Sequence, residues 1–221
     1  MAGQTRTQTG TRLFVASVTG TALGGTCSNA NPCVVDLGAG AHGITTSGVV
    51  ILQTGWGELN NRAFAVTVID ANSFSLDGID TTDTTFFPAD SNTVTSTTAS
   101  AFKEITQFTG FETSGGDAQS AKYQYIHDPR EQSVFDKFSA IERKVTFDAA
   151  IKGTENEILL SALTRSQKST AYRVLSRTGD YYLFNATIAL NTEVIHKAGG
   201  IDTLNAAIFS RAAANNYTAT A

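Results

Sequence analysis

The chain has 221 residues, which is enough for one large or two small domains with a real hydrophobic core. Only 16% of the residues are charged and the formal net charge is −4 at pH 7, so a general electrostatic attraction to nucleic acid or anionic lipid is not implied. The sequence has no apolar run as long as a membrane span and no apolar core near its start that would make a signal peptide. We therefore expect a protein made and used in soluble form, with no membrane partner.

Charge is distributed unevenly along the chain. Residues 1–96 carry three basic and seven acidic side chains, whereas residues 97–221 carry thirteen of each sign. A Thr-rich stretch at residues 80–100, which contains Pro88, separates these two compositions and favours a boundary there. We therefore expect two modules of different character.

Short β-strand patterns dominate the first module, and no helical periodicity occurs before residue 100. Gly, Asn, Asp or Pro separates each run from the next, and the turns at 60–61 and 70–73 are typical of hairpins. Strands at intervals of about ten residues indicate a small barrel or sandwich. The expected strands are residues 12–20, 32–37, 48–54, 62–70 and 73–79.

A glycine motif, G-x-G-x-x-G, lies at residues 38–43, with the spacing that cradles a dinucleotide pyrophosphate. Such a site needs a helix directly after the glycines, because the helix N-terminus supplies the amides that bind phosphate. Residues 44–52 are rich in β-branched side chains and lack helical spacing. The motif therefore predicts a tight turn between strands.

The residues that could carry chemistry do not form a catalytic set. Cys27 and Cys33 flank a five-residue loop, where a disulfide is possible but a reduced pair is favoured without a secretion signal. His42, His127 and His196 lie far apart, and none belongs to a pair with metal-ligand spacing. Because no nucleophile, base and stabiliser come together, we expect neither an enzyme nor a cofactor nor a metal site.

Residues 110–138 have weak periodicity but many large apolar side chains. A disordered linker would not carry so many, and a compact monomer would not leave so long a loop uncovered. We therefore expect an arm that is buried against another copy of the chain. The expected subunit-interface residues are Phe108, Phe111, Tyr123, Tyr125, Ile126, Phe135 and Phe138.

The remainder of the chain predicts one helix among strands. Thr154 and Glu157 form a capping box at the start of a helix over residues 155–167, whose apolar stripe consists of Ile158, Leu159, Ala162 and Leu163. Residues 144–152 alternate as a strand, and residues 181–197 alternate for seventeen residues. A strand of that length is typical of a sheet that continues beyond its own chain.

A set of short motifs runs through residues 31–88. It consists of His42-Gly43, Gly48-Val49-Val50, Gly55, the turn from Glu58 to Arg62, "AVTVIDANSFSLDG" at 65–78, and Asp80. On these motifs, residues 31–88 resemble a small β-barrel repeat of phage tail proteins, which is itself likened to the first catalytic cysteine half-domain of the ubiquitin-activating enzyme. The resemblance implies a structural or adhesive module and brings no cysteine chemistry, because Cys27 and Cys33 lie at or before its edge.

The order strand, long loop, strand, capped helix and long strands resembles the tail tube proteins of long, non-contractile-tailed phages. The resemblance covers residues 1–20 and 97–221, with residues 21–96 as a small inserted or appended β-barrel decoration. It implies a mainly β fold, a tail-tube-type β-sandwich or barrel with one flanking α-helix. In that family, hexameric rings stack into a tube around the passing DNA.

We therefore expect a virion structural protein of the tail, made in the host cytoplasm. Its partners would be other copies of itself, double-stranded DNA passing without sequence-specific contacts, the tape measure protein and other tail proteins. The alternative is a tail-tip or fibre module that contacts a cell-surface glycan. In that case Trp56 would be the surface on which a sugar stacks, although a single Trp is also typical of a barrel core.

Overall fold

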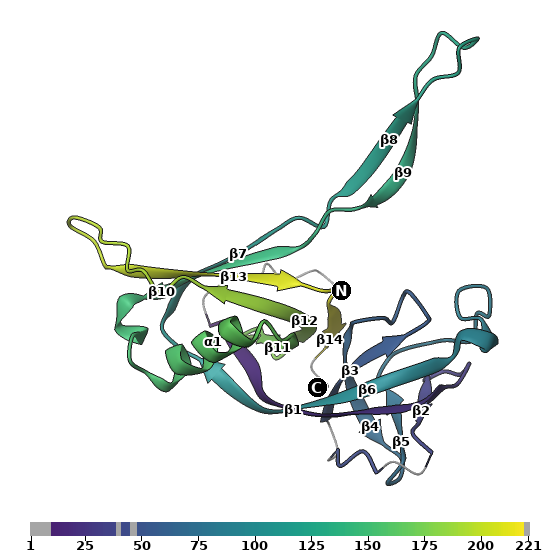
Figure 1. Cartoon of the computed structure of the whole chain (residues 1–221), viewed down its shortest axis with the longest axis horizontal. Helices are drawn as coiled ribbons and strands as arrows, with labels where there is room; N and C mark the ends of the chain where they lie inside the picture. The colour runs from purple at the N-terminus through teal and green to yellow at the C-terminus, as the bar shows by residue number, and fades with distance from the viewer. Residues whose placement is uncertain (1–9, 39–40, 45–47, 219–221) are drawn as a thin grey trace.

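The computed structural model describes residues 10–38, 41–44 and 48–218 (Figure 1), and its architecture is mainly β with one α-helix. The predicted fold class is thereby confirmed. The strands are β1 Arg12–Cys27, β2 Val34–Asp36, β3 Gly48–Thr54, β4 Ala63–Val68, β5 Ser73–Leu76, β6 Thr93–Ile105, β7 Phe108–Ser114, β8 Ala118–Tyr123, β9 Gln132–Phe138, β10 Glu142–Asp148, β11 Thr170–Leu175, β12 Tyr181–Leu190, β13 Thr203–Ser210 and β14 Asn215–Tyr217. The helices are α1 Glu155–Ser166 and the 3₁₀ turns η1 Ala89–Ser91 and η2 Ala149–Ile151.

One antiparallel sheet runs through most of the described chain, in the order β2-β5-β4-β3-β6-β1-β11-β12-β13-β10-β7. β2 also pairs with β1, and this contact closes the first six of these strands into a small barrel. β14 adds to β12, while β8 and β9 form a separate two-stranded hairpin. β1 and β6 pair along most of their length and belong both to the small barrel and to the remaining sheet, which we call the body.

The small barrel encloses its own hydrophobic core. Trp56, Phe64 and Phe74 are each at most 1% exposed, and closure of the barrel pairs strand edges that would otherwise face solvent. The predicted turn at residues 70–73 is present, because the Asp70 carboxylate accepts hydrogen bonds from the amides of Asn72 and Ser73, both at 2.8 Å. Local turn chemistry and apolar alternation together produce this unit.

The glycine motif falls between β2 and β3 in the chain, and its residues 38 and 41–43 are described. β2 precedes it, and Gly38 and Gly43 have φ values of 61° and 60°, which a residue with a Cβ rarely adopts. The next described element is β3, so the prediction of a turn between strands agrees with the structure on either side of the motif. The middle of the motif, residues 39–40, lies outside the described residues.

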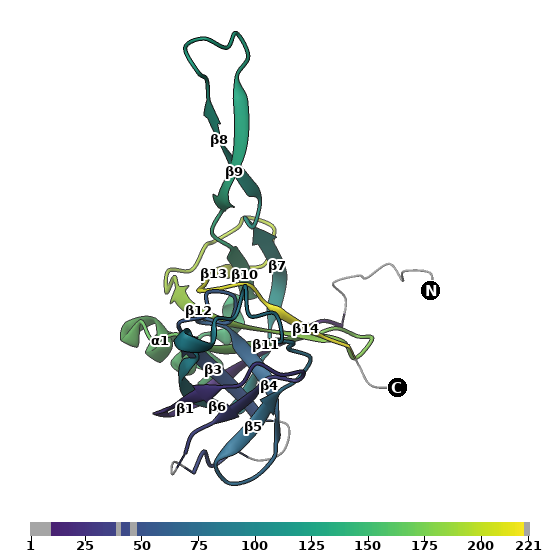
Figure 2. The ribbon, with the colours of Figure 1, turned by 90° about the vertical axis from the view of Figure 1, so that its right-hand side faces the viewer.

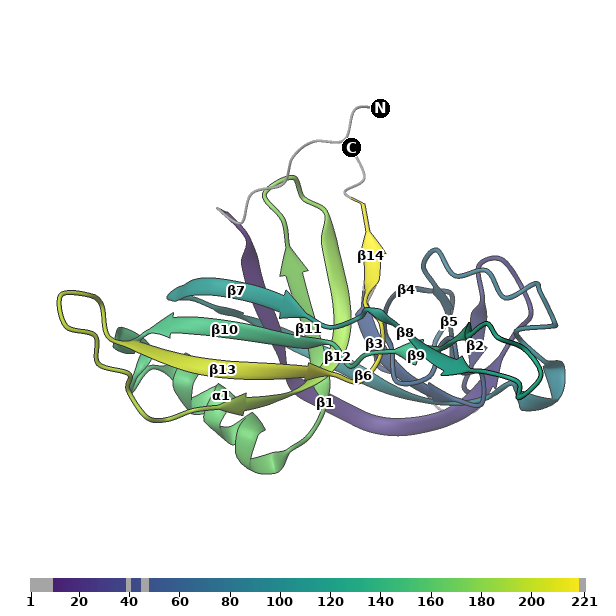
Figure 3. The ribbon, with the colours of Figure 1, turned by 90° about the horizontal axis from the view of Figure 1, so that it is seen from above.

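The body has a second core beneath α1. β12 pairs with β11 over residues 181–186 and with β13 over residues 186–190, so β7, β10 and β13 run across β11 (Figure 3), and side chains from both layers meet between them. Phe147, Tyr172 and Phe184 are buried there, with the rings of Tyr172 and Phe184 stacked at 5.4 Å between centroids. This core shares no buried residue with that of the small barrel.

The predicted helix is confirmed, with two changes in detail. Thr154 Oγ1 accepts from the amide of Glu157 at 3.4 Å, while the Glu157 carboxylate accepts from Gly153 and not from the Thr154 amide, which donates to the Ile151 carbonyl. The predicted apolar stripe is wrong, because the buried face of α1 is rotated slightly about the helix axis from the predicted face. Leu160 is buried and Leu159 and Leu163 are half-buried against the body core, whereas Ile158 is 63% exposed and Ala162 is exposed.

Several strand predictions were wrong in length. The strand predicted over residues 144–152 ends at Asp148 as β10, because residues 149–151 form the 3₁₀ turn η2, where the Asp148 carboxylate accepts from the Ala150 amide. β12 ends at Leu190, because the Asn191 side chain accepts from the amide of Glu193 and turns the chain. The seventeen-residue strand and the argument built on its length therefore do not hold, since β12 is paired within its own sheet. In contrast, β1 does not end at residue 20: a bulge between Thr19 and Ala22 lets it continue to Cys27.

Candidate functional site

The β8–β9 hairpin extends away from the body beyond the end of β7 (Figures 1 and 2). Its strands pair from Ala118 opposite Phe138 to Tyr123 opposite Gln132, and every residue of both strands is exposed. A two-stranded hairpin with no core beneath it is at best marginally stable in water. Its surface is therefore the part of the molecule most in need of a partner.

Large apolar side chains cover this hairpin and its tip. Their exposed fractions run from 42% for Tyr123 to 108% for Ile126. Tyr123 contacts Tyr125 edge to face at 5.5 Å between centroids, and Phe135 contacts Phe138 at 5.1 Å. Five of the seven residues predicted for the subunit interface thus lie together on one projection. Val134, 52% exposed, lies there too and was missed because the prediction counted aromatic residues and isoleucine only.

The polar contacts of the hairpin tip are local. The Asp128 amide donates to the Tyr125 carbonyl at 2.9 Å, and the Tyr123 hydroxyl donates to Gln132 Oε1 at 2.8 Å. Lys122 and Glu131 pair across the strands at 3.2 Å, an exposed contact worth about 1 kcal/mol at most. These contacts shape the tip but cover none of its aromatic rings.

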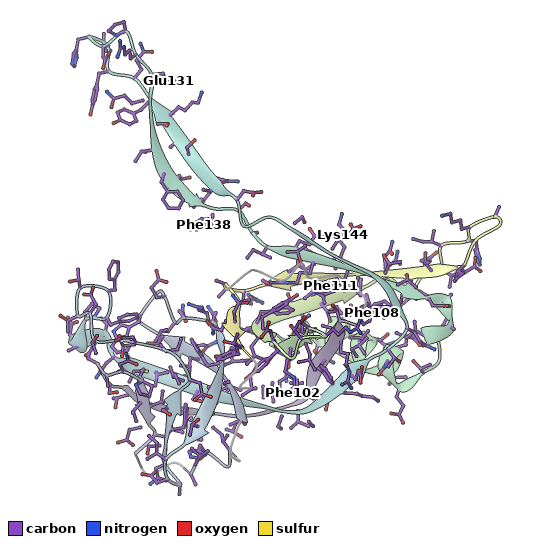
Figure 4. The ribbon with its side chains drawn as sticks, turned by 180° about the vertical axis from the view of Figure 1, so that it is seen from behind. Phe102, Phe108, Phe111, Glu131, Phe138 and Lys144 are labelled. Carbon is purple, nitrogen blue, oxygen red and sulfur yellow. The ribbon has the colours of Figure 1, made fainter. Side chains whose placement is uncertain are left out.

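Phe108 and Phe111, also predicted for the interface, differ from the other five. They lie on β7, at the root of the projection, and are half-buried against the body core (Figure 4). Both line a groove of about 1420 Å³ that lies between β7, the β11–β12 turn and β14. On the opposite wall, Tyr181 and Tyr217 are stacked at 5.1 Å between centroids. The groove and the hairpin are two distinct surfaces joined by β7.

The histidines have local partners. His42 is buried, its Nε2 lies 2.7 Å from the Asp70 carbonyl oxygen, and its Nδ1 accepts from the Ile44 amide. His127 stacks on Tyr125, and His196 pairs with Asp202 at 2.9 Å, where its hydrogen bond lowers the pKa of that carboxyl group. Each histidine thus contacts a different set of neighbours.

The thiols are both free and buried. The pKa of the Cys27 thiol is raised, first by a hydrogen bond with Cys33 and to a smaller extent by burial, so the thiol holds its proton tightly. Within the residues that the structure describes, no group of three His, Cys, Asp or Glu side chains is placed to hold a metal ion. No helix among these residues is long and apolar enough to cross a membrane.

Trp56 does not lie where the glycan hypothesis needs it. The side chain is 1% exposed, its indole N–H donates to the Pro88 carbonyl at 2.8 Å, and its ring contacts Phe87 edge to face. A sugar cannot stack on a ring enclosed in this way. Trp56 is instead a core residue of the small barrel, the other role that a single Trp can take.

Comparison with known protein families finds a match. The family described as phage tail tube protein, TTP, matches residues 54–218, from the end of β3 past β14 and thus well over half of the chain. The chain belongs to the phage tail tube protein family. It is therefore a structural protein of the virion tail, one of a family whose members form a tube. A search of curated proteins found no match.

For a tail tube protein, the important surfaces are those that meet neighbouring copies and other tail proteins. The match includes the hairpin, the body apart from β1 and the groove apart from Gly10 and Thr11, and it begins inside the small barrel. The likeness of residues 31–88 to the ubiquitin-activating half-domain has no support from this comparison and stays a prediction. The exposed aromatic hairpin is the candidate site with the clearest need for a partner.

Proposed function

We propose that this tail tube protein assembles into stacked hexameric rings whose central channel conducts double-stranded DNA during ejection, in a phage with a long, non-contractile tail. The observation that carries the assembly is the β8–β9 hairpin, whose aromatic side chains are exposed in the single chain. Their burial against the next copy would remove apolar surface from water, at about 25 cal/mol per Å². Tyr123, Tyr125, Ile126, Phe135 and Phe138 are the proposed contact residues.

The hairpin supports a head-to-tail contact. It projects away from the body (Figures 1 and 2), so it can reach a surface of the next copy that is different from the hairpin itself, which is the arrangement of a heterologous contact. A heterologous contact that closes produces a ring, and one that does not close produces a filament. A tube built of stacked rings uses both arrangements. Six copies per ring is what the resemblance to tail tube proteins implies.

Three arginines of the body are engaged by neighbouring side chains, which supports a channel in which DNA slides. Arg12 pairs with Glu104 at 2.5 Å, and Arg173 lies over the rings of Phe14 and Phe102 at 4.7 and 5.1 Å. Arg143 is 4% exposed and stacks on Phe184 at 3.9 Å. Cations engaged in this way are withdrawn from phosphate contacts, which would otherwise hold the DNA through counterion release.

In this proposal residues 1–20 and 97–221 form the wall of the tube, and residues 21–96 form a decoration on its outside. The separate hydrophobic cores of the body and the small barrel support this division. The tape measure protein, inside the tube, and the other tail proteins at its ends are the proposed further partners.

Electron microscopy of the purified full-length protein tests the proposal. We expect rings or tubes with a central pore and six subunits per ring, and a chain with residues 117–139 deleted should stay monomeric with its body folded. The deletion joins Gly116 to Ala140, which the hydrogen bond from the Gly116 amide to the Ser139 carbonyl already brings close. Tubes formed equally well by the deleted chain would overturn the role of the hairpin, and a full-length chain that stays single when concentrated would overturn assembly itself.

A further inference from the structure

The small barrel is connected to the body through a single paired ribbon, because the chain enters the barrel along β1 and leaves it along β6. This ribbon is irregular at the junction. Its register shifts between Thr19 and Ala22, and Ala101 on the opposite strand has a φ of 51°. A bulge bends and twists a strand pair locally. The ribbon alone is therefore a poor determinant of the angle between the two units.

The apolar contact between the units includes five alanines. Ala16, Ala171 and Leu183 of the body meet Val49, Ile51, Ala63, Ala65 and Ala99 of the barrel side, and the half-buried Phe102, Tyr181 and Tyr217 pack against them. Alanine methyl groups bury little area, and apolar attraction is non-directional. Packing thus brings the units together, while directional contacts are needed to fix their relative orientation.

β14 supplies the polar contacts that such packing lacks. The first residues of β4 extend beyond its pairing with β5, which begins at Val66. The Ala63 carbonyl accepts from Asn215 Nδ2 at 2.7 Å, and the Ala65 amide donates to the Tyr217 hydroxyl oxygen at 3.0 Å. Backbone groups that would be orphaned on β4 therefore find partners in side chains of the C-terminal strand.

The same strand is anchored in the body. β14 pairs with β12 from Tyr181 opposite Tyr217 to Leu183 opposite Asn215, and the two tyrosine rings stack. Asn215 is 6% exposed and accepts through Oδ1 from the guanidinium of Arg62, which also donates to the Glu58 carbonyl at 2.8 Å. β14 is thus held by backbone bonds on the body side and by side-chain bonds on the barrel side.

One further contact strengthens the junction. Asn185 of β12 is 2% exposed, and its Nδ2 donates to the Asn61 carbonyl at 3.0 Å, in the turn that precedes β4. Burial is the largest cause that raises the pKa of the Tyr217 hydroxyl, to about 12, so this hydroxyl stays neutral across the physiological range. The hydrogen bonds to the backbone at residues 61, 63 and 65 are directional. They therefore fix where β4 lies relative to β12 and β14, which apolar contact alone does not.

We propose that β14 is a clasp, formed by Asn215 and Tyr217, that locks the small barrel onto the body in one orientation. The barrel is then a rigid part of the subunit and not a tethered appendage. If the protein forms the tube proposed above, the barrels project from it at a fixed angle, a consequence that rests on the proposed function. The clasp itself does not depend on assembly, because all its contacts lie within one chain.

Distances between spin labels test the clasp in the full-length chain. Asp90→Cys on the barrel and Lys152→Cys on the body are exposed labelling positions, whereas the native Cys27 and Cys33 are buried. Labelled protein is diluted into an excess of unlabelled protein, so that only distances within one chain are measured. We expect one narrow distance distribution in the parent and at least a twofold broader one in the Asn215→Ala, Tyr217→Phe double variant. Tyr123→Phe, which removes a hydroxyl from the hairpin, is the matched control and should leave the width unchanged.

An unchanged width in the folded double variant would overturn the clasp. Should that variant not fold, Tyr217→Phe alone decides the question by hydrogen exchange, because it removes the acceptor of the Ala65 amide and leaves the ring stacked on Tyr181. We expect the Ala65 amide to exchange at least tenfold faster, with the amides between β3 and β6 unaffected, and equal exchange would refute the clasp. Electron micrographs of the same variants report tube formation separately, so the failure of one proposal is not mistaken for failure of the other.

Discussion

The small barrel and the β8–β9 hairpin are both made of short antiparallel strands, yet they solve the same physical problem in opposite ways. The barrel turns Trp56, Phe64 and Phe74 inward and pairs its strands into a closed ring. The hairpin leaves Phe135, Phe138 and its other aromatic side chains in solvent. Exposure of apolar side chains in this chain is therefore a property of particular elements, and we propose that another molecule completes the hairpin.

The largest effect on stability is expected from emptying the core of the closed unit. Trp56→Ala removes a side chain that is 1% exposed and leaves the Pro88 carbonyl without its donor, so we expect a loss of about 3–5 kcal/mol in the free energy of unfolding. Chemical denaturation followed by circular dichroism measures it. A loss below about 1 kcal/mol would show that the barrel does not depend on its own core, and the contrast with the hairpin would no longer hold.

The opposite pattern is expected for the hairpin. Phe135→Ala combined with Phe138→Ala should change the free energy of unfolding by no more than about 0.5 kcal/mol, because both rings are exposed in the single chain. The same variant should form few or no tubes, as counted in electron micrographs and by sedimentation. Phe86→Ala is the matched control, since that ring is 65% exposed on the small barrel, and it should leave assembly intact. Equal loss of tubes in both variants would remove the special role of the hairpin.

The smallest effect concerns a turn of the barrel and depends on pH. Hydrogen bonds from the Asn72 amide and from Ser73 lower the pKa of Asp70 below its ordinary value of 3.8. The charged form is therefore favoured by folding, so the stabilisation is complete above pH 3.8 and is lost as the pH falls through the lowered pKa of the folded state. Asp70→Asn keeps an acceptor oxygen but not the charge. The denaturation midpoint of this variant should differ from that of the parent by a small amount at pH 7. The difference should shrink in acid, because protonated Asp70 also lacks the charge. A difference that grows on acidification would contradict the argument.

Local signals in the sequence predicted local structure well. Thr154 and Glu157 placed the start of α1, and Asp70 marked a hairpin turn, because the partners of each lie within a few residues. The exposed side chains from Tyr123 to Phe138 were found for a similar reason: a run of large apolar residues without a repeat has no core of its own to fill.

What the sequence did not predict depends on contacts between distant residues. The apolar stripe of α1 was misplaced because the orientation of the helix is set by β12, against which Leu160 packs, and not by the helix itself. Trp56 was left open between a core and a surface role, since its enclosure depends on Phe87 and Pro88, about thirty residues further along the chain. Asn215 and Tyr217 gave no signal at all, because their barrel-side partners lie 152 residues away on β4.

The pairing of β1 with β6 has a consequence for how such genes change. Val18 lies opposite Ser100 and Thr19 opposite Ala99, so the two ends of the intervening segment are neighbours in space. A segment whose ends adjoin can be lengthened, shortened or exchanged without rethreading the rest of the chain. If residues 21–96 decorate the outside of the tube, as proposed, recombination at this strand pair would replace the small barrel while the reading frame of the body continues unaltered. A foreign domain grafted at the same pair would then be displayed once per subunit.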